Sequence, residues 1–501
     1  MGRIAVIGAG MGAMAAAARL AVAGHRVAVY ERAETYGGAV RRFERDGFGF
    51  DTGPGLLTLP AVWRDLFIKT GKEPLEACVE LVQVDPSARH VFADGTEVAV
   101  PNASRAGVVA ALDEALGAGA GGRWGDFLVR AREAWDRTRR PLLEEPLWPD
   151  WQVLADREPY PAVPHKRLLR TRRAATLAEV GAWELRDPRL AVLLESHALA
   201  YGLDPRVTPA SAAVLPYMEH AFGSWYVRGG VRELARAVYE RCVARRVEFH
   251  FGAEVTGVLE KNGRAAGLEL ADGQVTEADH VVAGVHPVRL RGLTERLLDD
   301  EGDVRPDPAP RPGRFTVLLA LRGPREAGAV HRTVVHAPDR TAELDSLASR
   351  PAEPVRPTVT VLRPDDPALR PDEEHESVVL SAVVPTETDR HLPERSERLA
   401  DLLVTAAEAA IPGLRERVLW REVRTPDQGE EETGAGFGGV SAPSLAAGEG
   451  RFLHPANTTR FPGLYRVGGW SHPGGGLPHA GMSGALVAGL IVEGPEFRGS
   501  Q

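Results

Sequence analysis

The chain has 501 residues, of which 44% are hydrophobic and 26% are charged, which is the balance of an ordinary globular protein and excludes wholesale disorder. Acidic residues outnumber basic ones by 69 to 60, and a net charge of −9 gives no broad basic surface for DNA or RNA, so we expect no nucleic-acid partner. The two cysteines, Cys78 and Cys242, are too few for a disulfide framework or a cysteine-based metal site, and no metal is expected.

The N-terminal sequence and the lengths of the apolar runs predict the cellular location of the protein. No basic segment followed by an apolar run opens the chain, so no secretory signal is visible. No apolar run approaches the ~18 residues that span a bilayer, which predicts a soluble, cytoplasmic protein. Five tryptophans gather between residues 124 and 183. Core packing is the favoured interpretation, but an apolar tunnel or peripheral membrane contact stays open.

The first segment has the pattern of a strand, a turn, a helix and a second strand. Residues 4–7 are apolar and rich in β-branched side chains, and a glycine-rich turn follows at residues 8–13. Residues 14–23 are rich in alanine, which predicts a helix that ends at Gly24. Residues 26–30 are expected to form the second strand.

Helical and strand patterns follow along the rest of the chain. Helices are expected at residues 106–116, 126–139, 175–185, 190–199, 231–245, 397–410 and 481–492. Strands are expected at residues 247–251, 254–259, 265–270, 280–283, 314–321, 358–362 and 377–384. Residues 141–164 have no clear period and are expected to be a loop or a mobile flap.

The glycine-rich turn carries the first chemical signal. Gly8, Gly10 and Ala13 fill a G-x-G-x-x-G/A pattern between a strand and a helix, where free backbone N–H groups bind a pyrophosphate. Glu31 follows the second expected strand, where a carboxylate accepts both hydroxyls of an adenosine ribose and disfavours a 2′-phosphate. This unit alone does not distinguish NAD from FAD.

Blocks beyond this unit resemble the phytoene desaturase family, within the wider group of FAD-dependent amine oxidase-like flavoproteins. The matching blocks, in the order of the family, are residues 31–38, 48–54, 225–230, 254–286 and 464–478. An ordered set that spans both ends and the middle of the chain is far more specific than one glycine motif.

The resemblance implies an α/β fold in which a discontinuous, Rossmann-like FAD-binding domain of the glutathione reductase type is combined with a mixed α+β substrate domain. The FAD domain would take residues 1–100, 215–287 and 451–501. The substrate domain would take residues 101–214, mainly helical, and 288–450.

The resemblance also implies which residues hold non-covalent FAD. Those expected along the ADP half and the pyrophosphate are Gly8, Gly10, Gly12, Ala13, Glu31, Arg32, Gly37, Gly38 and, for adenine, the backbone of Val255. Those expected beside the ribityl chain and the flavin ring are Gly468, Gly469, Pro478 and Met482. The family's arginine after the glycine pair is replaced by Ala39, so Arg41 or Arg42 is expected to supply that charge.

Catalytic candidates are few because flavin chemistry needs mainly positioning. His472 and His479 lie in the segment that resembles the flavin-ring motif and could move a proton; the alternative for each is a structural hydrogen bond or exposure to solvent.

The resemblance implies an FAD-dependent oxidoreductase that introduces C=C bonds into an apolar polyene, isoprenoid-like or related specialised-metabolite substrate, as in carotenoid biosynthesis, with oxygen or a quinone reoxidising the flavin. The alternatives are a redox-neutral double-bond isomerase, an oxidase of amines or specialised metabolites, and a lipid-carrying escort protein without enzymatic activity.

Overall fold

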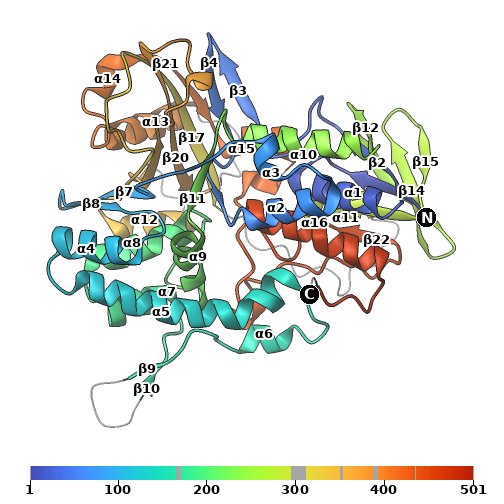
Figure 1. The fold of residues 1–501 in the computed structure, drawn as a ribbon, viewed down its shortest axis with the longest axis horizontal. Coiled ribbons are helices and arrows are strands. Elements are labelled where there is room, and N and C mark those ends of the chain that lie inside the picture. The colour runs from blue at the N-terminus through green and yellow to red at the C-terminus, as the bar shows by residue number, and fades with distance from the viewer. Residues whose placement is uncertain are drawn as a thin grey trace.

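The computed structural model describes residues 2–164, 171–294, 312–349, 354–386, 393–434 and 436–499. Figure 1 shows two large sheets in separate halves of the molecule, with a group of helices below the sheet on the left.

A parallel sheet brings together strands from the start, the middle and the end of the chain. In the described residues its order is β12 (Glu248–Phe251), β2 (Arg26–Glu31), β1 (Arg3–Ile7), β16 (His280–Ala283) and β22 (Leu464–Arg466). Ile4 lies opposite Val27 on one side and His280 on the other. This sheet confirms the expected Rossmann-like fold class and its assembly from distant segments.

The alternation of side chains along β1 determines what covers each face of this sheet. Ile4 and Val6 are buried against helices α1 (Met11–Val22), α10 (Arg232–Ala244) and α16 (Leu477–Val492). Ala5 and Ile7 point to the other face, where they pack against an antiparallel sheet. That sheet consists of β13 (Val255–Lys261), β14 (Arg264–Leu270) and β15 (Val275–Glu277). The result is a three-layer domain.

Helices α1 and α16 come very close to each other because small residues line their contact. A Cβ atom on Gly484 would lie 2.6 Å from the Gly12 carbonyl oxygen and 2.7 Å from the Ala15 Cβ. The alanines of α1 from residue 15 to residue 18 are fully buried. This contact joins the N-terminal turn of the chain to its C-terminal helix.

The second large sheet is mixed. In the described residues its order is β21 (Val418–Arg424), β17 (Gly313–Arg322), β20 (His375–Val384), β19 (Val359–Leu362), β18 (Arg332–Val335), β7 (Ala88–Val91) and β8 (Glu97–Val100). Along β17, the side chains of Phe315, Val317 and Leu319 pack on the same side as α13 (Pro393–Ala407). The alternate residues Leu318 and Ala320 pack against strand β4 (Phe48–Asp51) on the other side.

A helical layer lies below this sheet (Figure 1). It contains α4 (Arg105–Leu116), α5 (Ala120–Arg139), α7 (Leu177–Val180), α8 (Pro188–Leu199) and α9 (Val214–Phe222), with π-helical turns at Arg140–Glu144 and Gly181–Leu185. Trp124 and Trp135 are buried in its core, and Trp183 packs against the same core. Trp148 and Trp151 pack against a smaller buried cluster. These contacts favour core packing for the tryptophans.

Shorter elements connect these layers. The helices are α2 (Ala61–Thr70), α3 (Leu75–Cys78), α6 (Gln152–Asp156), α11 (Pro287–Thr294), α12 (Arg340–Ser349), α14 (Leu414–Arg417) and α15 (Pro426–Thr433). The strands are β3 (Arg42–Arg45), which pairs with β4; β9 (Val163–Pro164), which pairs with β10 (Thr171–Arg172); and β11 (Ser224–Val227), which lies between β5 (Leu57–Thr58) and β6 (Leu81–Gln83).

Three expectations need correction. The C-terminal helix begins at Leu477, four residues before the expected start, because Pro478 is compatible with a first helical turn. Residues 141–164 are not wholly loop: they hold part of a π-helical turn and all of α6, because Leu142 and Leu154 are buried against Leu453. Residues 88–100 pair with the mixed sheet as β7 and β8, although the sequence placed them in the FAD domain.

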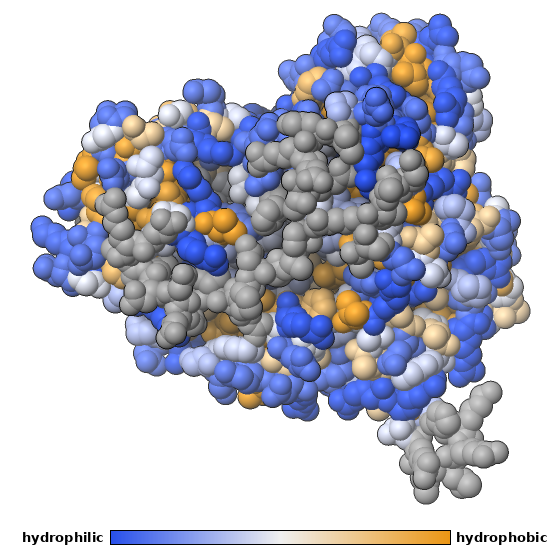
Figure 2. Space-filling model, turned by 180° about the vertical axis from the view of Figure 1, so that it is seen from behind, coloured by the Kyte–Doolittle hydropathy of each residue, from blue (hydrophilic) through white to orange (hydrophobic). Residues whose placement is uncertain are grey.

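Nothing in the described chain is a helix both long and apolar enough to cross a bilayer. The most exposed large hydrophobic residues, such as Ile68 on α2 and Val275 on β15, lie on separate elements. The face in Figure 2 is mostly hydrophilic, with scattered hydrophobic residues. Peripheral membrane contact stays a prediction.

We expect Gly484→Ala to lower the free energy of unfolding by about 1–3 kcal/mol, because the added methyl group overpacks the contact between α1 and α16. Chemical denaturation measures this change. The matched control is Gly122→Ala on α5, where a Cβ meets no atom within 4 Å, and it should raise stability by up to about 1 kcal/mol. Equal effects of the two substitutions would contradict the packing argument.

Candidate functional site

The turn between β1 and α1 has the geometry of a phosphate-binding turn. Gly8 has a φ of +87°, and its N–H donates to the Tyr30 carbonyl over 2.8 Å. Gly10 is the N-cap of α1, and no side chain of the described residues caps this helix start. Gly10, Gly12 and Ala13 line a large cavity, so the positive end of the helix dipole opens into it.

Glu31 stabilises this turn through hydrogen bonds to backbone N–H groups, and it does not line the cavity. Its Oε2 accepts from the Ala9 N–H over 2.7 Å, and its Oε1 accepts from the Ala33 N–H over 2.9 Å. Arg32 donates to the Glu431 carbonyl over 2.7 Å, and the Val255 carbonyl accepts from Arg289 over 3.2 Å. Contacts of Glu31, Arg32 and Val255 with a nucleotide stay predictions.

The expected pyrophosphate segment lies beside the turn. Gly37 donates to the Ala9 carbonyl over 2.8 Å, and Gly37, Gly38 and Arg41 line the cavity. Arg41 donates from Nε to the Gly38 carbonyl over 2.9 Å. Arg42 instead pairs with Glu44 over 2.9 Å. Of the two arginines that the sequence offered, Arg41 lines the cavity and Arg42 does not, and contact of Arg41 with a phosphate stays a prediction.

The expected flavin-ring segment completes this side of the cavity. Gly468, Gly469 and Pro478 line it, whereas Met482 packs against the helical core. A Cβ on Gly12 would lie 2.8 Å from the Gly468 Cα, so the two glycine segments are in direct contact. The first turn of α16 therefore faces the same cavity as the first turn of α1.

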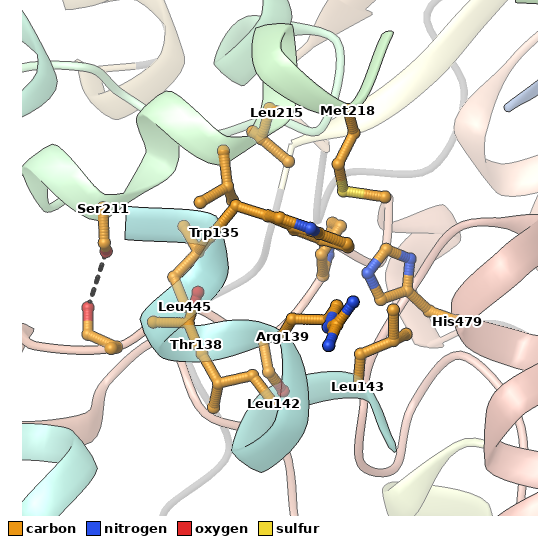
Figure 3. Close-up of a pocket in the computed structure, with 14 residues that line it drawn as sticks. Trp135, Thr138, Arg139, Leu142, Leu143, Ser211, Leu215, Met218, Leu445 and His479 are labelled. Atoms are coloured by element: carbon orange, nitrogen blue, oxygen red, sulfur yellow. Dashed lines mark hydrogen bonds between the residues drawn. The ribbon is translucent and has the colours of Figure 1, made fainter. Parts of the chain in front are cut away.

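Only one of the two candidate histidines reaches this cavity. His479 lines it and also lines a small adjoining cavity, where Trp135, Arg139 and Met218 point toward its ring (Figure 3). Burial, with a smaller effect of His472, lowers the pKa of His479 to about 4, so the imidazole is neutral at pH 7.

His472 has a different environment. It is fully buried, and its Nε2 forms a hydrogen bond of 2.9 Å with the Glu145 carbonyl oxygen. Burial lowers the pKa of His472 to about 4. Because His472 lies outside the cavity lining, the structure gives it a contact that positions the 471–476 loop rather than a path to a substrate.

Two sequence blocks behind the resemblance meet in space. Asp51, at the end of β4, accepts from the Val231 N–H over 2.8 Å and from the Arg232 N–H over 3.3 Å, at the start of α10. Burial raises the pKa of Asp51 to about 6, despite these hydrogen bonds. The block at 48–54 thus fixes the helix that follows the block at 225–230.

The cavity extends well beyond the flavin segments, to a volume of about 610 Å³. Its far wall includes polar and charged side chains that the sequence analysis did not single out: His90, His197, Tyr201, Glu219, Arg314 and Arg332. They come from strands β7, β17 and β18, from α8 and the turn that follows it, and from α9. No local motif marks them, because only the tertiary fold brings these elements together.

The glycines of the site pass a simple test of fit for a bound cofactor. No atom lies within 4 Å of an ideal Cβ on Gly10 or on Gly468, and both residues line the cavity. Side chains there would occupy the space along which a dinucleotide would lie. A phosphate-binding turn and a glycine-rich helix start on one cavity are the features of a dinucleotide-dependent oxidoreductase, and FAD fits this site.

Comparison with known proteins gives the family. The model of the flavin containing amine oxidoreductases matches residues 14–492, and the chain belongs to this family, whose cofactor here is FAD. The chain is similar to a 4,4'-diapolycopene oxygenase of a Methylomonas species, at 27% identity over 98% of each chain. It is also similar to a zeta-carotene-forming phytoene desaturase of Myxococcus xanthus, at 28% identity over 97% of this chain and 93% of the relative.

Solved structures share the fold. An oxidoreductase from Methanosarcina mazei matches with a TM-score of 0.63 at 18% identity, over 97% of this chain and 99% of its own. A putrescine oxidase bound to putrescine matches with a TM-score of 0.63 at 16% identity, over 98% of this chain and 99% of its own.

We expect Gly10→Leu to abolish FAD binding without unfolding the protein. The backbone of Gly10 has an ordinary φ of −73°, and its Cβ would project into open space in the cavity, so the side chain competes with the cofactor and not with the core. Visible absorption measures FAD content, and circular dichroism measures folding. Gly122→Leu, which also meets no atom within 4 Å but lies outside the cavity, is the matched control. Full FAD content in Gly10→Leu would show that the cofactor lies elsewhere.

Proposed function

We propose that this protein is an FAD-dependent desaturase that removes a hydride and a proton from adjacent carbons of an apolar polyene, so that a C=C bond forms. Dioxygen or a quinone is the proposed final electron acceptor. The observation that carries the proposal is the cavity of about 610 Å³ that runs from the glycine segments around Gly10 and Gly468 to the mixed sheet. Relatives named as carotenoid desaturases or oxygenases align with almost the whole chain, which supports a polyene substrate.

The residues of this chain have separable tasks in the proposed reaction. Bound FAD supplies a hydride acceptor at its N5 atom. Gly10, Gly12 and Arg41 would hold the phosphates, and Gly468 would leave room for the ring. The neutral imidazole of His479 faces the same space and takes up the proton that the substrate loses.

Purified protein loaded with FAD and mixed with phytoene in detergent under anaerobic conditions tests this function. We expect loss of the flavin absorption bands as the product gains conjugation, because both electrons move from substrate to cofactor. A changed double-bond geometry without loss of the flavin bands would establish an isomerase instead. A protein that takes up no FAD would overturn the proposal altogether.

We expect His479→Leu to slow this flavin reduction by about 100-fold or more, because a positioned base is lost. The rate of the unchanged protein should fall only as the pH drops toward about 4, where the imidazole becomes protonated, and His479→Leu should lack this fall. Stopped-flow absorption measures the rate, and bound FAD is quantified in each variant. His220→Leu, on α9 outside the cavity, is the control. A rate unchanged by His479→Leu would remove His479 from the mechanism.

A further inference from the structure

The far wall of the cavity carries charges that an apolar substrate does not explain. Arg314 lies near the start of β17, Glu219 on α9 and Arg332 on β18, and all three line the cavity. Placing a charged group against a hydrocarbon costs free energy unless another group compensates the charge. Each charge therefore needs a partner, either in the protein or in the ligand.

Glu219 and Arg332 compensate each other. Their side chains form a two-pronged ion pair, in which one of the contacts is 3.2 Å between Arg332 Nη1 and Glu219 Oε2. Arg332 also donates from Nε to the Ser87 carbonyl over 3.0 Å. Burial acts to raise the pKa of Glu219, but Arg332 and His197 outweigh it and lower the pKa, so the carboxylate stays ionised. This pair needs no ligand.

Arg314 has no such compensation among the described residues. Its Nη2 donates to the Ala200 carbonyl over 3.1 Å, and no carboxylate in the described parts of the chain forms an ion pair with it. A guanidinium carries five N–H donors and keeps its charge in proteins. One neutral carbonyl leaves the charge and most of these donors unmatched.

Side chains along β17 point alternately to its two faces, and this explains why Arg314 faces the cavity. Leu318 and Ala320 lie on the face of β17 that packs against β4, and Arg314 and Thr316 continue this face into the cavity wall. The guanidinium is thus held by a central strand of the sheet and not by a surface loop.

Tyr201 places this arginine near the reacting end of the cavity. Arg314 donates to the carbonyl of Ala200, the residue before Tyr201. Its charge also acts on the Tyr201 hydroxyl, because it lowers the pKa of Tyr201 against the burial that raises this pKa. A Cβ on Gly476 would lie 3.6 Å from the Tyr201 hydroxyl oxygen and 3.3 Å from His479 Nδ1. Tyr201 and His479 therefore meet in front of the first turn of α16, and Arg314 lines the same cavity within charge range of Tyr201.

We propose that Arg314 and Tyr201 bind a carboxylate of the substrate, so that the natural substrate is an apolar polyene chain that ends in a carboxylate. Arginine matches the two oxygens of a carboxylate with parallel hydrogen bonds, and the tyrosine hydroxyl adds a third donor. An alcohol would accept hydrogen bonds but would leave the positive charge uncompensated. This assignment rests on the proposed desaturase function and fixes which end of the substrate lies near His479.

Binding of two probes with the same polyene chain, all-trans-retinoic acid and all-trans-retinol, to the FAD-loaded protein tests the proposal. The perturbation of the flavin absorption spectrum gives both dissociation constants without turnover. We expect the acid to bind at least about 10-fold more tightly than the alcohol, since hydrogen bonds between a guanidinium and a carboxylate are stronger than those to a neutral hydroxyl. Arg314→Met should abolish this preference, and Tyr201→Phe should reduce it.

Arg322→Met is the matched control, because Arg322 ends the same strand and donates to the Glu416 carbonyl outside the cavity. It should leave the preference for the acid unchanged. Arg314→Lys keeps the positive charge but lacks the planar pair of donors, so it should retain part of the preference for the acid over the alcohol. This variant tests the proposal even where Arg314→Met folds poorly.

Equal affinities for the acid and the alcohol in the unchanged protein would overturn the carboxylate assignment. So would a preference that survives in Arg314→Met, or a loss of bound FAD in that variant, which would assign Arg314 to the cofactor instead. Failure of the flavoprotein function itself is seen separately, as missing flavin absorption before any probe is added.

Discussion

The close contact between α1 and α16 is the constraint on which the rest of the site depends. Gly12 and Gly484 let two helices from opposite ends of the chain approach so closely that a single added methyl group has no space. Both helix starts then open into one cavity, with their dipoles directed at the same region. Without this contact, the glycine turn before α1 and the expected flavin-ring segment before α16 would have no fixed position relative to each other. The packing of α1 against α16 fixes them on one wall of the cavity.

The mixed sheet provides the opposite wall through strict alternation along a single strand. One face of β17 is a continuous apolar layer against α13, which stabilises the sheet. The other face changes character along its length, from Leu318 and Ala320 under β4 to Thr316 and Arg314 in the cavity. The strand that stabilises the mixed sheet therefore also presents polar side chains to the cavity. A shift of its register by one residue would bury Arg314 in the apolar core.

The sequence was most informative where function depends on local backbone geometry. The strand, turn and helix around Gly8 and Gly10 could be predicted because one motif contains both the fold and the chemistry. The ordered blocks likewise indicated the discontinuous domain and FAD. The strands β7 and β8 were misplaced because β8 pairs with β7, and β7 joins the mixed sheet through β18, which lies more than two hundred residues away along the chain. The place of Arg314 on the cavity wall was hidden for the same reason, since strand periodicity predicts two faces but does not show what each face contacts.

Burial also decides which groups on the cavity wall carry charge. Desolvation lowers the pKa of His90, His197 and His479, so these imidazoles line the cavity in their neutral forms. Glu219 and Arg332 neutralise each other. Burial lowers the pKa of Arg314, but the ordinary pKa of a guanidinium lies so far above 7 that Arg314 keeps its charge. Glu343 also lines this wall and accepts hydrogen bonds from the N–H and the hydroxyl of Thr358, and burial raises its pKa. Among the described residues of the far wall, Arg314 is therefore the arginine that forms no ion pair. Such a wall favours an elongated apolar ligand with one anionic end over a uniform hydrocarbon. Only the anionic end can compensate the positive charge of Arg314.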